Sequence, residues 1–272
     1  MPKFQRGNVT LYYELDGSGP PAVYISGFGC HSNDLIGTAI RQSLSPQFTV
    51  LAVDNRGAGQ TITGEGDSVT IEDMADDIAA IMDHYGISQA PMLGVSMGGA
   101  IAMTLALRHP QKVKSMVVAV SLAWSQTPSR GIYMLTTSRK MRDAGIPRDL
   151  ISRYTAVFLL SENSFEYEGL MQAWENSPED PFQQTQQGFE QQLSAITRYD
   201  IRDQLCKINV PTLVMSSPDD LLVPPRLQDE IAKGIPNAEI KHYPGGHAFM
   251  VLPMYSPQFF QDVLEFWGRH FG

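Results

Sequence analysis

The sequence predicts an α/β fold in which a mostly parallel central sheet is flanked by helices. Short apolar runs alternate with helical patterns over the first 120 residues. Near-continuous apolar strands separated by helices are what a parallel sheet buried on both faces requires. With 272 residues, the chain is long enough to bury a sizeable core without disulfides, and its two cysteines are too few for a disulfide framework.

Each expected strand is a short apolar or alternating run, and several of these runs end at a turn residue. In chain order these runs are 9–13, 22–26, 48–53, 92–95, 116–120, 212–215 and 238–242.

Two helices have clear boundaries in the sequence. Thr70 and Asp73 resemble a capping box, apolar residues then recur at helical spacing over 71–85, and a glycine follows as a natural stop. The second helix is expected over 97–107 and is ended by a proline. Its small residues would allow it to pack closely on a sheet.

The composition changes after Trp124. Residues from about 125 to 200 lose the alternation of strands and helices and become rich in Gln, Ser and Met, with helical patterns bounded by prolines. We therefore expect 125–200 to form a helical cap, or lid, inserted into a core domain made of 1–124 and 201–272.

Charge and hydropathy restrict the partners of the protein. Twenty Lys and Arg against 29 Asp and Glu give a net charge of −9. This balance disfavours binding to nucleic acid or anionic lipid, since a basic surface is what neutralises phosphates. The N-terminus lacks the apolar segment of a secretory signal, and the longest near-apolar run, 116–124, is half a membrane span. We expect a cytoplasmic protein without nucleic-acid or membrane partners; its oligomeric state is not predicted.

A nucleophile is indicated by the motif Gly-x-Ser-x-Gly at 94–98, between an apolar strand and a helix. In such a turn the hydroxyl of Ser96 projects above the sheet, and the flanking glycines avoid Cβ clashes. The N–H of Met97 then lies at a helix N-terminus, where partial positive charge stabilises an oxyanion. The alternative is a chance Gly- and Ser-rich turn.

A serine nucleophile needs a histidine as base. His247 is preferred among the six histidines, because it lies in the Gly-rich segment 243–249 after the expected strand 238–242. His31, which follows another Gly-rich segment, is its competitor.

An acid is needed to orient the histidine, and two carboxylates follow the expected strand 212–215. Asp219 follows a proline and could be a turn residue. Asp220 precedes the apolar residues 221–223 and is better placed to be partly buried against an imidazole. The segment after the strand 116–120 offers no carboxylate. We therefore favour Asp220.

Taken together, these features resemble the α/β-hydrolase family over nearly the whole chain. The chain order Ser96, Asp220, His247 is the order of that family. Within the family, the enol-lactonase and small carboxylesterase branch is the most similar. The segments that carry the resemblance are 26–29, 54–61, 94–98, 108–113, 200–214, 220–224 and 246–247.

The resemblance implies an oxyanion hole formed by the backbone N–H groups of Phe28 and Met97. Ser26 stands where the family frequently has a histidine. The glycines of the turn 54–59 are compatible with a phosphate-binding loop. The turn lacks, however, the Lys-Ser/Thr pair of a P-loop and the glycine spacing of a dinucleotide-binding site. We interpret it as a structural turn.

The cap is expected to cover the triad and to supply part of an apolar pocket. The pocket residues that we expect are Gly27, Trp124, Phe158, Trp174, Val223 and Phe249. For the cap aromatics the alternative is packing against the core, since apolar residues at helical spacing are usually buried. An anionic acyl group would be bound by an arginine or a lysine in the pocket. The candidates are Arg130, Arg139, Arg142 and Arg153, and the alternative for each is a solvated position on the surface.

The expected reaction is hydrolysis of a small acyl substrate, an ester, lactone or related compound, through an acyl-enzyme and without metal or cofactor. Three alternatives stay open at this point. They are a small-ligand receptor or regulator on the same fold, a cofactor-free perhydrolase or haloperoxidase, and a hydrolase of carbon–carbon bonds. The natural substrate is not predicted.

Overall fold

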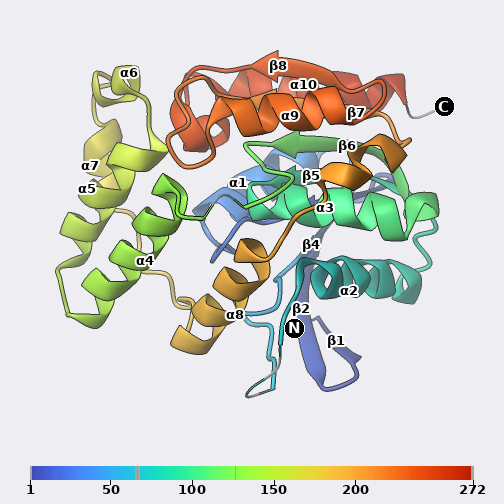
Figure 1. Cartoon of the computed structure of the whole chain (residues 1–272), viewed down its shortest axis with the longest axis horizontal. Helices are drawn as coiled ribbons and strands as arrows, with labels where there is room; N and C mark the ends of the chain where they lie inside the picture. The colour runs from blue at the N-terminus through green and yellow to red at the C-terminus, as the bar shows by residue number, and fades with distance from the viewer. Residues whose placement is uncertain (1, 65, 67, 126, 271–272) are drawn as a thin grey trace.

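The structure, a computed structural model, describes residues 2–64, 66, 68–125 and 127–270. These residues form an eight-stranded sheet in the order β1-β2-β4-β3-β5-β6-β7-β8 (Figure 1). β1 pairs antiparallel with β2 and β2 with β4, and all other neighbours are parallel. The strands are β1 (Lys3–Arg6), β2 (Val9–Asp16), β3 (Pro21–Ile25), β4 (Thr49–Val53), β5 (Ala90–Val95), β6 (Val113–Ala119), β7 (Thr212–Ser216) and β8 (Glu239–His242).

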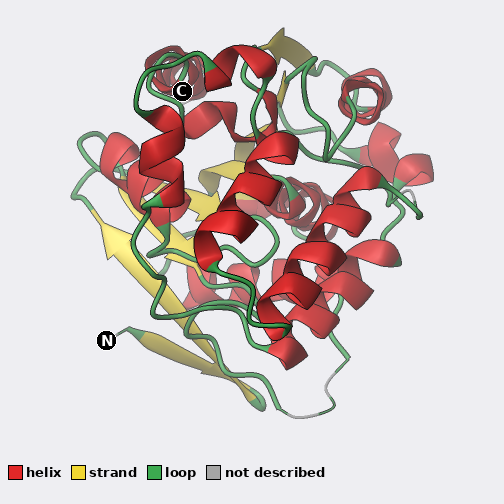
Figure 2. Ribbon diagram, turned by 90° about the vertical axis from the view of Figure 1, so that its left-hand side faces the viewer, coloured by secondary structure: helices red, strands yellow, loops and turns green. Residues whose placement is uncertain are grey.

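Helices cover both faces of this twisted sheet (Figure 2). Alternate residues of each central strand enter different cores: Met92 of β5 packs in one buried cluster and Leu93 in the other. On the first face lie α2 (Ile71–His84), α3 (Met97–Arg108) and α9 (Pro225–Gly234); on the second lie α1 (Leu35–Leu44) and α10 (Ser256–Arg269). The expected fold class, a mostly parallel sheet flanked by helices, is confirmed.

The two helices with clear sequence boundaries form where expected. Thr70 Oγ1 accepts a hydrogen bond from the N–H of Asp73 at 3.1 Å, and the Asp73 carboxylate accepts one from the N–H of Thr70 at 3.0 Å. This reciprocal capping starts α2. β1, α1, α9 and α10 were not among the expected elements.

Between β6 and β7 the described residues form five α-helices, which lie within the expected cap: α4 (Arg130–Asp143), α5 (Arg148–Leu159), α6 (Glu162–Phe165), α7 (Leu170–Glu175) and α8 (Gln186–Thr197). α4 to α7 extend to one side of the sheet, at the left of Figure 1. Ile196 of α8 instead enters the core cluster of α2 and α3. The division of the chain into a core and a cap at 125 and 200 stays a prediction.

The part of the chain that the structure describes also contains three short 3-10 helices: η1 (Pro110–Lys112), η2 (Arg202–Lys207) and η3 (Gly246–Val251). η3 packs against α5, where Ala248 of η3 and Ala156 of α5 share a small buried cluster. None of the described helices is long and apolar enough to cross a membrane.

Candidate active site

Ser96 occupies a sharp turn between β5 and α3. Its backbone has φ 55° and ψ −120°, a conformation that is strained for a residue with a Cβ. The turn is closely packed, because a Cβ on Gly94 would lie 2.4 Å from the carbonyl oxygen of Gly98, and a Cβ on Gly98 would lie 2.1 Å from that of Ile25. The two glycines of the motif therefore allow the strand, the turn and the helix to approach this closely.

The loops that follow β5, β6, β7 and β8 lie along one edge of the sheet, because the strands are parallel and adjacent. Hydrogen bonds join the strand ends in turn: Ser96 N–H to Ala119 O (2.9 Å), Val120 N–H to Met215 O (2.9 Å), Tyr243 N–H to Ser216 O (2.8 Å) and Gly246 N–H to Ser217 Oγ (3.1 Å). Ser96, Asp220 and His247, which come from three of these loops, are thereby placed at the same edge.

A buried carboxylate–imidazole pair lies in the loops after β7 and β8. Nδ1 of His247 is 2.8 Å from Oδ2 of Asp220, and both residues are buried. Oδ1 of Asp220 accepts hydrogen bonds from the N–H groups of Leu222 and Val223, each at 2.9 Å. Gln228 of α9 donates to Oδ2 at 3.2 Å. These donors hold the carboxylate in place, and the carboxylate in turn fixes the orientation of the imidazole ring.

The hydroxyl of Ser96 forms no hydrogen bond with any residue that the structure describes. The contact between Ser96 Oγ and His247 that a triad requires is therefore not made here. In enzymes without substrate this contact is often long and shortens when substrate binds.

Ser96 lines a small cavity of about 70 Å³. Phe28 and Met97, the residues expected to supply the oxyanion hole, line the same cavity, as does Val223. Leu135 of α4 also lines it. This volume is well below the roughly 300–1,000 Å³ of a typical small-molecule pocket.

Of the other residues expected in the pocket, Gly27 adjoins Ser96, since a Cβ on Gly27 would lie 3.3 Å from the Cβ of Ser96. The remaining four lie outside this cavity, as the described residues define it.

Those four aromatic side chains have other partners. The indole N–H of Trp124 donates to Glu230 at 2.8 Å. Phe249 is fully buried and stacks on a tyrosine with ring centroids 4.7 Å apart. Phe158 contacts a tyrosine ring within α5, and Trp174 packs against the small cluster between the cap and η3. Their apolar patterns indicate burial but not the surface against which each side chain is buried.

His31, the competing histidine, joins the loop after β3 to the cap. Its Nε2 lies 3.0 Å from the carboxylate of Asp180, and its Nδ1 accepts a hydrogen bond from the N–H of Asn33 at 3.2 Å. The ring is almost completely buried and packs edge-on against Phe182.

Two buried glutamines, neither of them among the expected site residues, support the candidate site. Gln228 contacts Asp220, as described above. Gln192 of α8 accepts a hydrogen bond from the N–H of Gly29 at 2.8 Å, and its amide donates to the carbonyl of Arg56 at 2.8 Å. Gln192 lies in a Gln-rich segment whose composition does not separate buried from exposed positions.

The Gly-rich turn after β4 is held by Asp54. The carboxylate of Asp54 accepts hydrogen bonds from the N–H of Ser32 at 2.7 Å and of Gln60 at 2.8 Å. A Cβ on Gly59, whose φ is +56°, would lie 2.1 Å from this carboxylate. These contacts are those of a structural turn.

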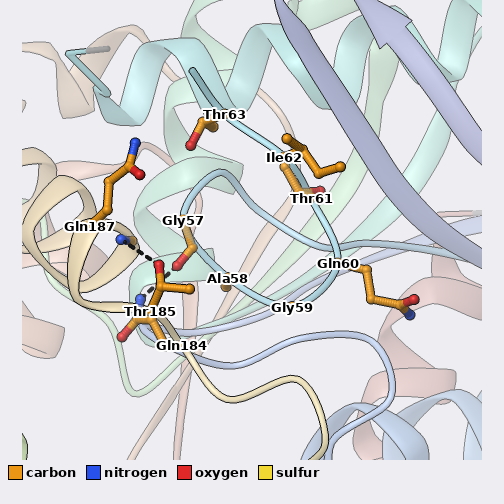
Figure 3. A pocket seen from close by; sticks show the side chains of 11 residues that line it. Gly57, Ala58, Gly59, Gln60, Thr61, Ile62, Thr63, Gln184, Thr185 and Gln187 are labelled. Carbon is orange, nitrogen blue, oxygen red and sulfur yellow. Dashed lines mark hydrogen bonds between the residues drawn. The ribbon is translucent and has the colours of Figure 1, made fainter. Parts of the chain in front are cut away.

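A separate cavity of about 320 Å³ lies between this turn and the start of α8 (Figure 3). The amide of Gln184 donates to the carbonyl of Gly57 across it at 2.9 Å. The described residues that line this cavity are all uncharged, which gives a phosphate no counterion.

Comparison with known proteins supports a family assignment. Residues 20–252 match the family model described as the alpha/beta hydrolase fold. RutD of Caulobacter sp. (strain K31), named as a proposed carbamate hydrolase, is 30% identical over 258 residues, which cover 91% of this chain and 92% of that protein. RutD of Azorhizobium caulinodans is 28% identical over 270 residues, 97% of each chain. The crystal structure of the enol-lactonase from Burkholderia xenovorans LB400 shares the fold, with a TM-score of 0.79 at 22% identity over 98% of this chain and 100% of that one. The chain therefore belongs to the α/β-hydrolase family and is a hydrolase.

Proposed function

We propose that this hydrolase cleaves an ester, a lactone or a related acyl compound, with Ser96 as nucleophile, His247 as base and Asp220 as the acid that orients it. One observation carries the proposal. A strained serine faces a small apolar cavity, and a buried Asp–His pair 2.8 Å apart follows the neighbouring strands at the same sheet edge. A serine is activated by such a pair when substrate brings the hydroxyl and the imidazole together.

In the proposed reaction, Nε2 of His247 takes the proton of the Ser96 hydroxyl while Oγ attacks the acyl carbon. Asp220 keeps the other imidazole proton on Nδ1 and stabilises the imidazolium. The N–H groups of Phe28 and Met97 stabilise the oxyanion. The intermediate collapses when the alkoxide leaves with the proton from His247. Water, deprotonated by His247, then attacks the acyl-serine, and the acid is released as His247 returns that proton to Oγ of Ser96.

The choice of acyl substrates over other compounds has two supports. The cavity beside Ser96 fits a short acyl group, since its volume is about 70 Å³. The names of two similar proteins refer to acyl compounds, a carbamate for RutD and an enol lactone for the Burkholderia protein. Because the identity to RutD reaches 30%, a carbamate is a second candidate substrate class.

The test measures kcat/KM for a panel of p-nitrophenyl esters, lactones and carbamates. We expect turnover of at least one class, and Ser96→Ala to lower kcat by about 10³-fold or more, since triad residues act as a unit. Ser125→Ala is the matched control, because Ser125 lines the same cavity without lying in the strand-to-helix turn. Full activity of the Ser96→Ala variant would refute the assignment. Stoichiometric ligand binding without turnover would instead favour a receptor.

A further inference from the structure

A second cavity adjoins the one that contains Ser96. Its volume is about 260 Å³, and its lining includes Phe28 and Leu135, which also line the smaller cavity. Gly29 and Cys30, the residues that follow Phe28 in the loop, form another part of its wall. The two cavities are therefore adjacent, and they share the side chains of Phe28 and Leu135 in their walls.

Three arginines of the cap line this second cavity: Arg139 and Arg142 of α4 and Arg148 at the start of α5. The carboxylate in the described lining is Asp180, which lies 3.0 Å from the imidazole of His31. The lining thus carries three positive charges against one negative charge. This is the reverse of the whole chain, whose net charge is −9.

The arginines are only partly neutralised. Arg139 forms an ion pair with Asp143 at 2.8 Å, but its Nε is buried and has no hydrogen-bond partner among the described residues. The Arg142 guanidinium forms neither a hydrogen bond nor an ion pair with a residue that the structure describes. Arg148 is different, because it donates to carbonyl oxygens of Ser177 and Pro178 and so holds the cap segment before α8.

Placing two guanidinium groups beside the same cavity has an electrostatic cost. Partial burial and the neighbouring charge of Arg139 both lower the pKa of Arg142. An anion bound between them would remove this repulsion. Guanidinium groups are well suited to carboxylates, which they bind with two parallel hydrogen bonds.

We propose that this cavity is a subsite for a carboxylate on the substrate, so that the preferred substrate is an ester or lactone that also carries a carboxylate group. The inference rests on the proposed function, because the reacting carbonyl is taken to lie at Ser96. The carboxylate arm then passes Phe28 and Leu135 to reach Arg139 and Arg142. The negative net charge of the protein repels such substrates at long range, and the local arginines offset this repulsion at the site.

The experiment compares matched pairs of esters that differ only in one terminal group, a carboxylate or a methyl. One series places this group on the acyl arm and a second places it on the alcohol arm, and each covers arms of two to six methylenes. The quantity measured is the ratio of kcat/KM for the anionic ester to that for the neutral ester. We expect the wild-type ratio to exceed about tenfold at the best length, and Arg142→Gln and Arg139→Gln each to lower it by about tenfold.

Arg153→Gln is the control, because Arg153 lies on the same cap but pairs with Glu175 outside this cavity. It should leave both esters unaffected. A wild-type ratio near one at every length, or a ratio that survives both Arg139→Gln and Arg142→Gln, would overturn the subsite.

Failure of the proposed function is distinguishable, since neither ester of any pair would then be hydrolysed. In that case calorimetry of glutarate and adipate binding to the wild type and to Arg142→Gln decides the subsite alone. Binding that weakens about tenfold in the variant supports it, and equal or absent binding overturns it.

Discussion

The side-chain oxygen of Gln192 in α8 accepts a hydrogen bond from the N–H of Gly29 at 2.8 Å, although the two residues are 163 positions apart. The same oxygen accepts from the amide of Gln184, and the amide of Gln192 donates to the carbonyl of Arg56. Gln192 is completely buried. One side chain therefore connects α8 to the loop that carries Phe28, the expected donor to the oxyanion.

We predict that Gln192→Leu lowers kcat for ester hydrolysis by about 10- to 100-fold with a smaller change in KM. The substitution removes the acceptor of the Gly29 N–H and the donor to the Arg56 carbonyl, and the loss of a buried hydrogen-bond partner costs about 1–3 kcal/mol, so the loop loses its fixed position. Gln187→Leu is the control, since Gln187 also joins α8 to a loop but donates to Gly64 instead. A kcat for Gln192→Leu that matches the control would show that this contact does not position the oxyanion loop.

Adjacent carboxylates allow a test of the orienting acid. Asp220 is buried and contacts His247, whereas Asp219 is exposed. We expect Asp220→Asn to lower kcat by about 10³-fold or more, because an amide no longer selects the imidazole tautomer or stabilises its charge. Asp219→Asn should stay within about twofold of the wild type. Steady-state measurement of kcat for the two variants shows which aspartate orients His247. An equal loss of kcat in both variants would argue against Asp220.

The size of the cavity beside Ser96 predicts a preference for short acyl groups. Among neutral esters, kcat/KM should be highest for acetyl to butyryl and about tenfold lower for octanoyl, because about 70 Å³ cannot hold a long chain. Leu135→Ala should move the optimum to chains about two methylenes longer. A chain-length profile of both proteins provides the measurement. An octanoyl optimum in the wild type would contradict the cavity as the acyl site.

Asp76 of α2 predicts a pH-dependent part of the stability. The Arg108 guanidinium, and to a smaller extent His109, lower the pKa of Asp76 from 3.8 to about 2. A carboxyl whose pKa is lower in the folded state stabilises the fold above its unfolded pKa, and this contribution is lost as pH falls toward the folded value.

Asp76→Asn should therefore lower Tm by about 3 °C at pH 7, and its difference from the wild type should shrink as pH falls from 4 towards 2. Calorimetric scans at pH 7, 4 and 3 measure this. Asp83→Asn is the control, because the ion pair of Asp83 with Lys112 is largely solvated on the aspartate side and is worth little. If the Tm difference between Asp76→Asn and the wild type grew as the pH fell, the predicted direction of the pH dependence would be wrong.

The parts of the structure that depend on neighbours in sequence were predictable. The capping box of α2 involves residues three positions apart, and the Gly-x-Ser-x-Gly turn needs only the strand and helix on either side. The alternation of strands and helices determined the fold class for the same reason, since each parallel connection is local. β1 was missed because its four residues, KFQR, include one apolar residue and so form no apolar run.

Contacts between distant segments could not be predicted from one sequence. The apolar character of Trp124, Phe158 and Phe249 indicated burial, but the partner surface of each depends on how the cap and the C-terminal helix pack. The role of Gln192 could not be predicted for the same reason. A polar residue in a polar segment gives no sign that it is buried opposite the N–H of Gly29.

Covalent labelling with a fluorophosphonate tests the central claim most directly. This reagent reacts with a serine only when a neighbouring base activates the hydroxyl and donors stabilise the charged phosphoryl oxygen. The account predicts one adduct per chain by intact mass, located on Ser96 by peptide mapping, and strongly slowed labelling in His247→Ala. An unlabelled protein, or an adduct on a serine outside the turn between β5 and α3, would contradict it.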